Sequence, residues 1–234
     1  MITAVFFDLD GTLLPMDQDL FIKAYIGGMA KKMAPHGYSP DALAKAVWKG
    51  TGAMTQNDGS VTNEVLFWNS FNAAMDRNCK EDEPLFMEFY RNEFQNVKNA
   101  CGYTEASAQI LELLKQKGIR RILATNPLFP PIATYSRVRW AGLQPEDFEW
   151  ITTYDNSSYC KPNPDYYREI LGKLGLQPEN CLMVGNDAVE DMAAREVGMQ
   201  VFLLTDCLIN KDGRDLSSYP SGSFDALMDL IRSL

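Results

Sequence analysis

The sequence predicts an α/β protein in which a parallel sheet forms the core and an all-helical domain is inserted after the first strand. Two observations lead to this prediction. Short apolar runs of strand length alternate with amphipathic segments of helical length, as expected when helices cover both faces of a parallel sheet. The segment 17–96, in contrast, carries helical patterns and no convincing strand.

The core elements follow one another along the chain in a strand–helix–strand rhythm. The apolar runs that we expect to be strands are residues 2–7, 119–124, 181–184 and 201–204, with a weaker run at 148–151. Each predicted core helix is followed by a glycine, a common C-terminal stop; these helices are 105–117, 164–174 and 188–197. A last helix, 224–234, is expected to pack on the outside of this Rossmann-like core.

The inserted segment interrupts this rhythm. Its patterned stretches all indicate helices, namely 20–33, 40–48, 63–74 and 83–94. The first strand alone would expose its backbone hydrogen-bonding groups, so we expect it to pair with the later strands. The sequence therefore predicts a core domain made of residues 1–16 and 97–234 and a helical cap domain made of residues 17–96.

Composition restricts the classes of partner and location. Lys and Arg total 22 against 31 for Asp and Glu, and the resulting net charge of −9 repels nucleic acid. Five cysteines without a C-x-x-C pair and a single histidine argue against a disulfide framework and against a histidine-rich zinc site. With no basic leader and no apolar stretch of about 18 residues, a soluble, cytoplasmic protein without a membrane partner is expected.

The strongest chemical signal is the string FFDLDGTLL at residues 6–14. Because side chains alternate along a strand, Asp8 and Asp10 are expected to point the same way at its carboxyl end. That end is where α/β sheets place their active sites. A solvated acidic turn is the alternative, but the apolar strand before the two carboxylates and the Gly-Thr pair after them favour a cation site.

Three further motifs occur in order: ILATN at 122–126, CKPNP at 160–164 and MVGNDAVED at 183–191. Together with the first string they resemble the four motifs of the haloacid dehalogenase superfamily, whose members are mostly magnesium-dependent phosphohydrolases. The resemblance extends over residues 2–204 except for the insert. It is greatest to the branch of phosphoglycolate phosphatases and β-phosphoglucomutases, in which such an insert is a C1 cap that carries substrate selectivity.

The resemblance implies roles for the residues that perform the chemistry. Asp8 is the expected nucleophile, which forms an aspartyl-phosphate, and Asp10 is the expected general acid and base. Lys161 is the local positive charge that a phosphorylated substrate requires on an acidic protein. Thr125 and Asn126, at the end of a strand, are expected to hold phosphoryl oxygens.

The resemblance also implies a Mg²⁺ site formed by Asp8, the backbone carbonyl of Asp10, and Asp187. Asn186 stands before that acid where the family more often has Gly-Asp, which leaves the register of this loop open. Asp191 lies four residues further on. It is expected either to orient Lys161 or a metal-bound water, or to be only a favourable acid at a helix N-terminus.

Inside the insert, the string WKGTG at 48–52 has two interpretations. It is either a loop that faces the active site and selects substrate, or a helix C-terminus with a favourable lysine and a glycine stop. The aromatic residues of the insert have helical spacing, and we assign them to core packing; they are Phe67, Trp68, Phe71, Phe86, Phe89, Tyr90 and Phe94.

The sequence therefore predicts a Mg²⁺-dependent phosphohydrolase that cleaves a phosphate monoester of a small metabolite through an aspartyl-phosphate. A sugar phosphomutase on the same scaffold is the alternative, although no cap residue that could return the phosphoryl group is identified. A dehalogenase is disfavoured because those relatives lack the second aspartate, which this chain keeps as Asp10. A non-catalytic binding protein is the least favoured reading, since all the motifs are intact. Oligomeric state is not predicted.

Overall fold

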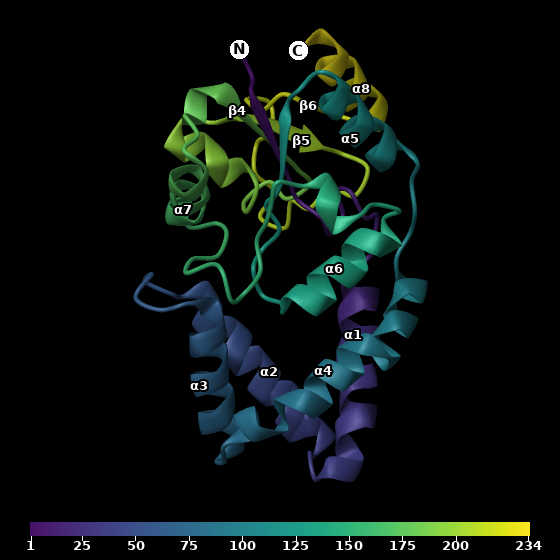
Figure 1. Cartoon of the computed structure of the whole chain (residues 1–234), viewed down its shortest axis with the longest axis vertical. Helices are drawn as coiled ribbons and strands as arrows, with labels where there is room; N and C mark the ends of the chain where they lie inside the picture. Colours follow the sequence, from purple (N-terminus) through teal and green to yellow (C-terminus); the bar gives the residue numbers. More distant parts are fainter.

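The computed structural model describes residues 1–234 and contains a six-stranded parallel sheet with helices around it (Figure 1). The strand order is β3-β2-β1-β4-β5-β6. The strands are β1 (Ala4–Phe7), β2 (Arg120–Leu123), β3 (Trp150–Ile151), β4 (Cys181–Gly185), β5 (Gln200–Leu204) and β6 (Ser221–Gly222). The first strand lies between two later ones, so its backbone groups are paired on both sides. The predicted α/β fold class is confirmed.

Side chains of the central strand alternate between two hydrophobic clusters, as a strand covered on both faces requires. Val5 and Phe7 belong to the larger cluster, which includes residues of α5 (Ala106–Gln116) and α8 (Phe224–Ser233). Ala4 and Phe6 belong to the second, together with residues of α7 (Pro164–Leu174) and of the 3₁₀ helix η6 (Met192–Val197). The predicted helices over 105–117, 164–174 and 224–234 are therefore confirmed.

Three elements of the core differ from the prediction. Residues 188–197 form a turn followed by η6 rather than an α-helix, because the Asp187 side chain accepts the N–H groups of Val189 and Glu190 and closes a turn. Helix α6 (Pro131–Trp140) was not predicted, since two prolines precede a mixed run of polar and apolar residues. Strand β6 is too short and polar to be recognised, and it pairs only with β5. Two further 3₁₀ turns, η4 (Pro145–Asp147) and η5 (Pro178–Asn180), lead into β3 and β4.

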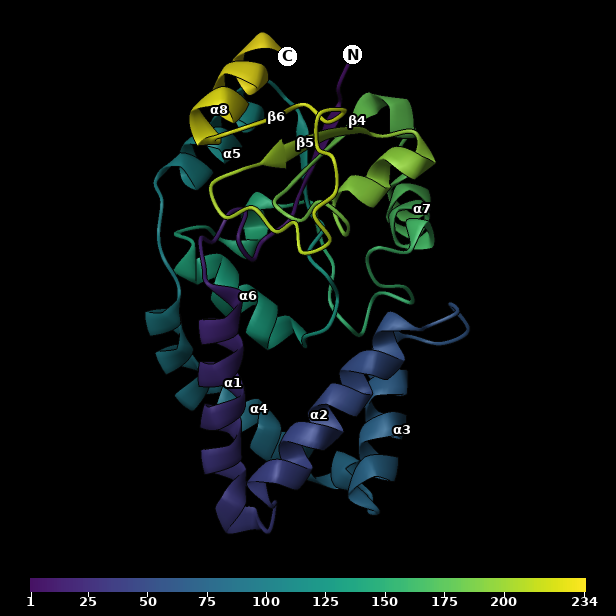
Figure 2. The same ribbon diagram turned by 180° about the vertical axis from the view of Figure 1, so that it is seen from behind.

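The insert is all-helical, as predicted, and its helices gather at the end of the molecule opposite the two termini (Figures 1 and 2). They are α1 (Gln18–Met33), α2 (Pro40–Thr55), α3 (Asn63–Met75) and α4 (Glu83–Arg91), with the 3₁₀ turns η1 (Ala34–His36), η2 (Cys79–Asp82) and η3 (Glu93–Ala100). The two chain segments that connect the insert to the sheet run side by side. Met16 and Cys101 form an antiparallel bridge, and the Gly102 N–H donates to the Pro15 carbonyl over 2.7 Å.

Helix α2 continues to Thr55, so neither a loop nor a helix end occurs at 48–52. The glycine at position 50 has a packing reason: a Cβ atom there would collide with the Phe67 ring of α3, against which α2 packs. The helix boundary that both interpretations assumed is thus wrong, because the glycine permits close helix contact rather than ending the helix. The string does face the pocket that contains Asp8 and Asp10, since Trp48 and Thr51 line it. No helix of the structure has the length and apolar character needed to cross a membrane.

Candidate active site

The two aspartates of the first motif follow β1 directly, at the carboxyl edge of the sheet. Asp8 is buried, and its N–H continues the sheet by donating to the Val184 carbonyl over 2.9 Å. Gly11 then turns the chain with φ = 88°, and a Cβ atom there would collide with the Asn186 side chain. Asp10 therefore stands in a tight loop that only glycine can complete.

Lys161 joins two carboxylates from different parts of the chain. Its Nζ donates to Asp8 Oδ1 over 2.9 Å and to Asp191 Oδ1 over 2.7 Å, and its side chain is fully buried. Burial disfavours the ammonium, but the carboxylates of Asp191 and Asp8 outweigh it, so the pKa of Lys161 lies well above its ordinary value. The lysine is thus a permanent positive charge next to Asp8.

Asp191 connects Lys161 to the turn that follows β4. Its second oxygen, Oδ2, accepts the Asp187 N–H over 2.9 Å, and a Cβ atom at Gly185 would collide with its carboxyl group. Burial raises the pKa of Asp191, while the charge of Lys161 lowers it. Asp191 therefore contacts Lys161 directly, which is the first of the two roles considered for it.

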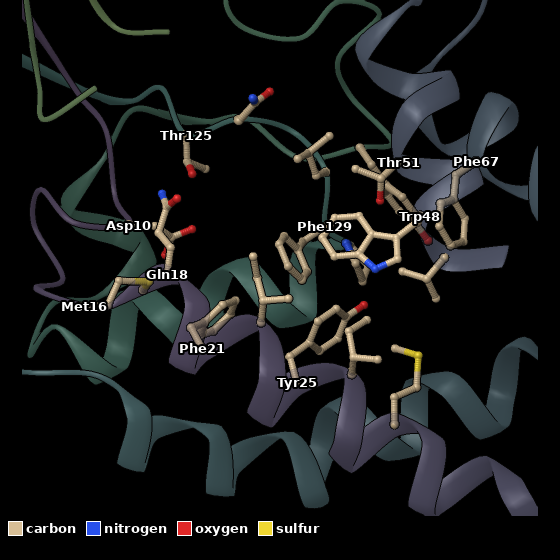
Figure 3. A pocket seen from close by; sticks show the side chains of 18 of the residues that line it. Asp10, Met16, Gln18, Phe21, Tyr25, Trp48, Thr51, Phe67, Thr125 and Phe129 are labelled. Carbon is tan, nitrogen blue, oxygen red and sulfur yellow. The ribbon is translucent and has the colours of Figure 1, made fainter. Parts of the chain in front are cut away.

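Thr125 and Asn126 follow β2 and reach the same edge. The Thr125 carbonyl accepts hydrogen bonds from the hydroxyls of Thr152 and Tyr166, while its side chain points toward Asp10 (Figure 3). The Asn126 side chain is occupied instead: Oδ1 accepts the Lys161 N–H over 3.2 Å, and Nδ2 donates to Glu190 over 3.0 Å. Of the two predicted phosphate-binding residues, Thr125 is therefore the one whose side chain has no hydrogen bond within the protein.

The turn after β4 brings both Asn186 and Asp187 to the pocket, but in different ways. Asn186 contacts the first motif: its Oδ1 accepts from the Thr12 hydroxyl over 2.8 Å, and its Nδ2 donates to the Cys207 carbonyl. Asp187 uses one carboxylate oxygen to accept two N–H groups of its own turn. No three side chains of Asp, Glu, His or Cys are gathered closely enough to form a metal site by themselves.

The structure adds a residue that the sequence did not indicate, Arg137 of α6. Its guanidinium donates to Asp10 Oδ2, and it is buried at 1% exposure with the Phe129 ring 4.3 Å away. The other oxygen, Asp10 Oδ1, is buried without a hydrogen-bond partner. Burial raises the pKa of Asp10, Arg137 opposes the rise, and the charge of Asp8 adds to it.

Arg137 could have been found only if α6 had been predicted. In a helix over 131–140, Arg137 shares a face with the buried residues Ala133 and Trp140, whereas Arg139 is exposed. An arginine on the apolar face of a helix next to a strand end is the signal that points to a buried acidic partner.

Glu190 also lines the pocket, together with the four aspartates described above, and accepts the hydrogen bond of Asn126. Burial raises the pKa of Glu190 to about 8, against the opposing charge of Lys161. The site therefore places several carboxyl groups around one pocket, and two buried cations contact Asp8 and Asp10 from behind its lining. Such an arrangement can hold a phosphoryl group, supply a carboxylate nucleophile and move a proton.

Comparison with known proteins agrees with these motifs. The sequence model of the haloacid dehalogenase-like hydrolases matches residues 2–198. Phosphoglycolate phosphatase 1 of Pseudomonas aeruginosa is 28% identical over 206 residues, which cover 86% of this chain and 68% of that protein. Glyceraldehyde 3-phosphate phosphatase of Methanothermobacter thermautotrophicus is 26% identical over 234 residues, covering 93% of this chain and 95% of that protein. The crystal structure of a phosphatase from Thermococcus onnurineus superposes with a TM-score of 0.61, at 21% identity and 98% coverage of both chains.

Proposed function

The chain belongs to the haloacid dehalogenase-like hydrolases, and on that premise we propose that it is a Mg²⁺-dependent phosphatase of small phosphorylated metabolites that forms an aspartyl-phosphate. The observation that carries this proposal is the contact of buried Lys161 with Asp8, which lines one pocket together with Asp10 and Thr125. A carboxylate can act as a nucleophile without a general base, and the hydrogen bond from Lys161 orients that of Asp8.

The geometry suggests which atoms act in each step. Lys161 engages Asp8 Oδ1, so the free oxygen Oδ2 attacks phosphorus while the bond from phosphorus to the ester oxygen breaks. Asp10 gives that ester oxygen a proton from Oδ1, the oxygen that Arg137 leaves without a partner. Water then attacks the phosphorus of the aspartyl-phosphate, returns a proton to Asp10, and releases phosphate from Asp8.

The oxygens present suit a hard cation. Asp187 uses only Oδ1 in the hydrogen bonds of its own turn, so its second carboxylate oxygen remains as an acceptor at the site. We propose that Asp8, the Asp10 carbonyl and Asp187 hold Mg²⁺. Bound there, the ion would neutralise negative charge that builds up on the transferring phosphoryl group.

We propose that residues 17–96 act as a cap over a core of residues 1–16 and 97–234. Support comes from the adjacent connecting segments at Pro15 and Gly102, about which the insert could move as a lid. The insert side of the pocket contains no acid, lysine or histidine that could return a phosphoryl group to a product. This composition favours a hydrolase over a phosphomutase.

The test is phosphate release from p-nitrophenyl phosphate and from a panel of metabolite phosphates with Mg²⁺. Asp8→Asn should lower the rate by at least about 1,000-fold, because it removes the attacking carboxylate, and should leave the melting curve nearly unchanged. Asp229→Asn, at an exposed position of α8, is the matched control. EDTA should abolish turnover and added Mg²⁺ should restore it. Full activity of Asp8→Asn, or of the chelated and dialysed protein, would contradict the proposal.

A further inference from the structure

The pocket that begins at Asp8 and Asp10 continues into the helical insert as a cavity of about 270 Å³. Figure 3 shows its two ends: Asp10 and Thr125 lie at one, and Trp48, Thr51 and Phe67 lie at the other. Hydrophobic residues make up 17 of the 29 that line it. Since inorganic phosphate needs only the polar end, most of the cavity must receive the organic part of the substrate.

Charge is nearly absent from the insert end. Lys211, an exposed residue of the segment after β5, is the only basic residue among those that line the cavity. The phenols of Tyr25 and Tyr90 are hydrogen-bonded to each other over 2.8 Å, so one of them donates its hydrogen to the other, and neither carries a charge. A second carboxylate or phosphate on the substrate would lose its hydration there without gaining a cation, which is costly.

The apolar walls come from both parts of the molecule and are held by packing. Phe67 stacks on Phe71 with ring centroids 5.4 Å apart, and Phe21 meets Phe129 of the core edge-on at 6.2 Å. Trp48 also lines the cavity, yet 52% of its surface is exposed. An indole that is half exposed beside an apolar cavity gains burial when an apolar group enters.

We propose that the natural substrates are phosphate monoesters of an uncharged apolar group, aliphatic or aromatic, which occupies the cavity between α1, α2 and α3. This proposal rests on the phosphatase function and narrows it. It sets this chain apart from its relatives named for glycolate and glyceraldehyde phosphates, whose organic groups are small and polar.

The test is a series of n-alkyl phosphates from methyl to octyl, compared with phosphoglycolate and glyceraldehyde 3-phosphate. Within the alkyl series the leaving group stays chemically alike, so only burial changes. We expect kcat/KM to rise by about threefold to fourfold for each methylene that the cavity can still accept. The two polar metabolite phosphates should fall below butyl phosphate.

A pair of variants on α2 locates the effect. Thr51→Trp fills the insert end of the cavity and should lower kcat/KM for octyl phosphate by at least about tenfold, while methyl phosphate is little affected. Thr55→Trp places the same side chain one turn further along at an exposed position that does not line the cavity, and should change neither. If Thr51→Trp lowered kcat/KM equally for octyl and methyl phosphate, the cavity would not be the site that binds the alkyl chain.

The outcomes separate this inference from the function on which it rests. A kcat/KM that stays constant or falls with alkyl chain length, or that is higher for phosphoglycolate, overturns the proposed apolar substrate class. The proposed phosphatase activity is not affected by this outcome. If no ester is hydrolysed, the phosphatase proposal fails. The apolar site can then still be tested by binding: the Asp8→Asn variant is titrated with octyl phosphate and with methyl phosphate, and tryptophan fluorescence reports the affinity for each ester. Tighter binding of octyl phosphate supports an apolar site, whereas equal or weaker binding overturns it.

Discussion

The carboxyl edge of the sheet and the helical insert form opposite walls of one pocket but are stabilised in opposite ways. At the edge, buried charges face one another, as in the contacts of Lys161 with Asp8 and Asp191. In the insert, rings pack on rings, as where Phe89 meets Tyr25 and Phe94. The proposed function therefore assigns reactivity and selectivity to separate regions. Substitutions of charged residues at the edge should change the rate of reaction as well as stability, whereas those in the insert should change stability or substrate choice.

The largest expected contrast comes from two variants matched in stability. Lys161→Met leaves two buried carboxylates without their cation, and Phe89→Ala leaves a cavity in the insert, so each should lower the free energy of unfolding by about 3–5 kcal/mol. Lys161→Met should also lower kcat by at least about 100-fold, because a charge next to the phosphoryl group is lost. Phe89→Ala, whose side chain does not line the pocket, should keep kcat within about threefold.

Urea titration and kinetics at a temperature where both variants remain folded measure the two quantities. A fall in kcat for Phe89→Ala as large as that for Lys161→Met would show that the two regions are not separable.

Arg137 offers an intermediate test, because it reaches from α6 to Asp10 at the edge. If it positions the oxygen that carries the proton, Arg137→Met should lower kcat for an alkyl phosphate by about 10–100-fold. The same variant should lower kcat for p-nitrophenyl phosphate only a few-fold, since nitrophenolate leaves without a proton. Arg137→Lys should recover part of the loss, and Arg139→Met, on the exposed side of α6, is the control. Equal losses on both esters would assign Arg137 a merely structural role.

The smallest expected effect concerns stability and pH. The pKa of Glu190 is raised to about 8, so the folded protein keeps this proton while the unfolded chain, with an ordinary glutamate, releases it from about pH 4.5 upward. Glu190 therefore costs stability progressively as the pH rises from about 4.5 to 8. Glu190→Gln keeps an acceptor for Asn126 and should be more stable than the parent by about 1–3 kcal/mol at pH 8, with no difference near pH 4.

Urea unfolding in EDTA at several pH values measures this gain. Glu196→Gln removes an exposed charge nearby and should leave the pH dependence as it is. A gain for Glu190→Gln that is equally large at pH 4 would contradict the pKa assignment.

The sequence could predict the sheet and most of its edge because those residues obey local rules. Asp8 and Asp10 follow an apolar strand, and parallel strands end at one edge of a sheet, which brings Thr125 after β2 and Asp187 after β4 to the same edge. Lys161 lies in the segment between β3 and α7, and only the resemblance of its motif predicted it. Arg137 was missed because its helix begins with prolines and has a weak pattern. The position of Asn186 depends on a hydrogen bond from the distant Thr12, which no local rule contains.

The cavity also could not be predicted from local sequence patterns. Helical spacing predicted that Phe67, Trp68, Phe71 and Phe86 pack in a core, yet all four also line the pocket. Periodicity shows which residues share a helix face, but it does not distinguish a face that meets another helix from one that meets an open volume. Only the arrangement of α1, α2 and α3 in space makes that distinction.

The hydrogen bond between Gly102 and Pro15 has a consequence for how such proteins can diverge. Since the chain departs from the sheet and rejoins it at neighbouring points, helices of any number or length could be exchanged between those points without disturbing strand pairing. Mutation and recombination could then alter which compounds are recognised while the hydrolytic machinery is inherited intact.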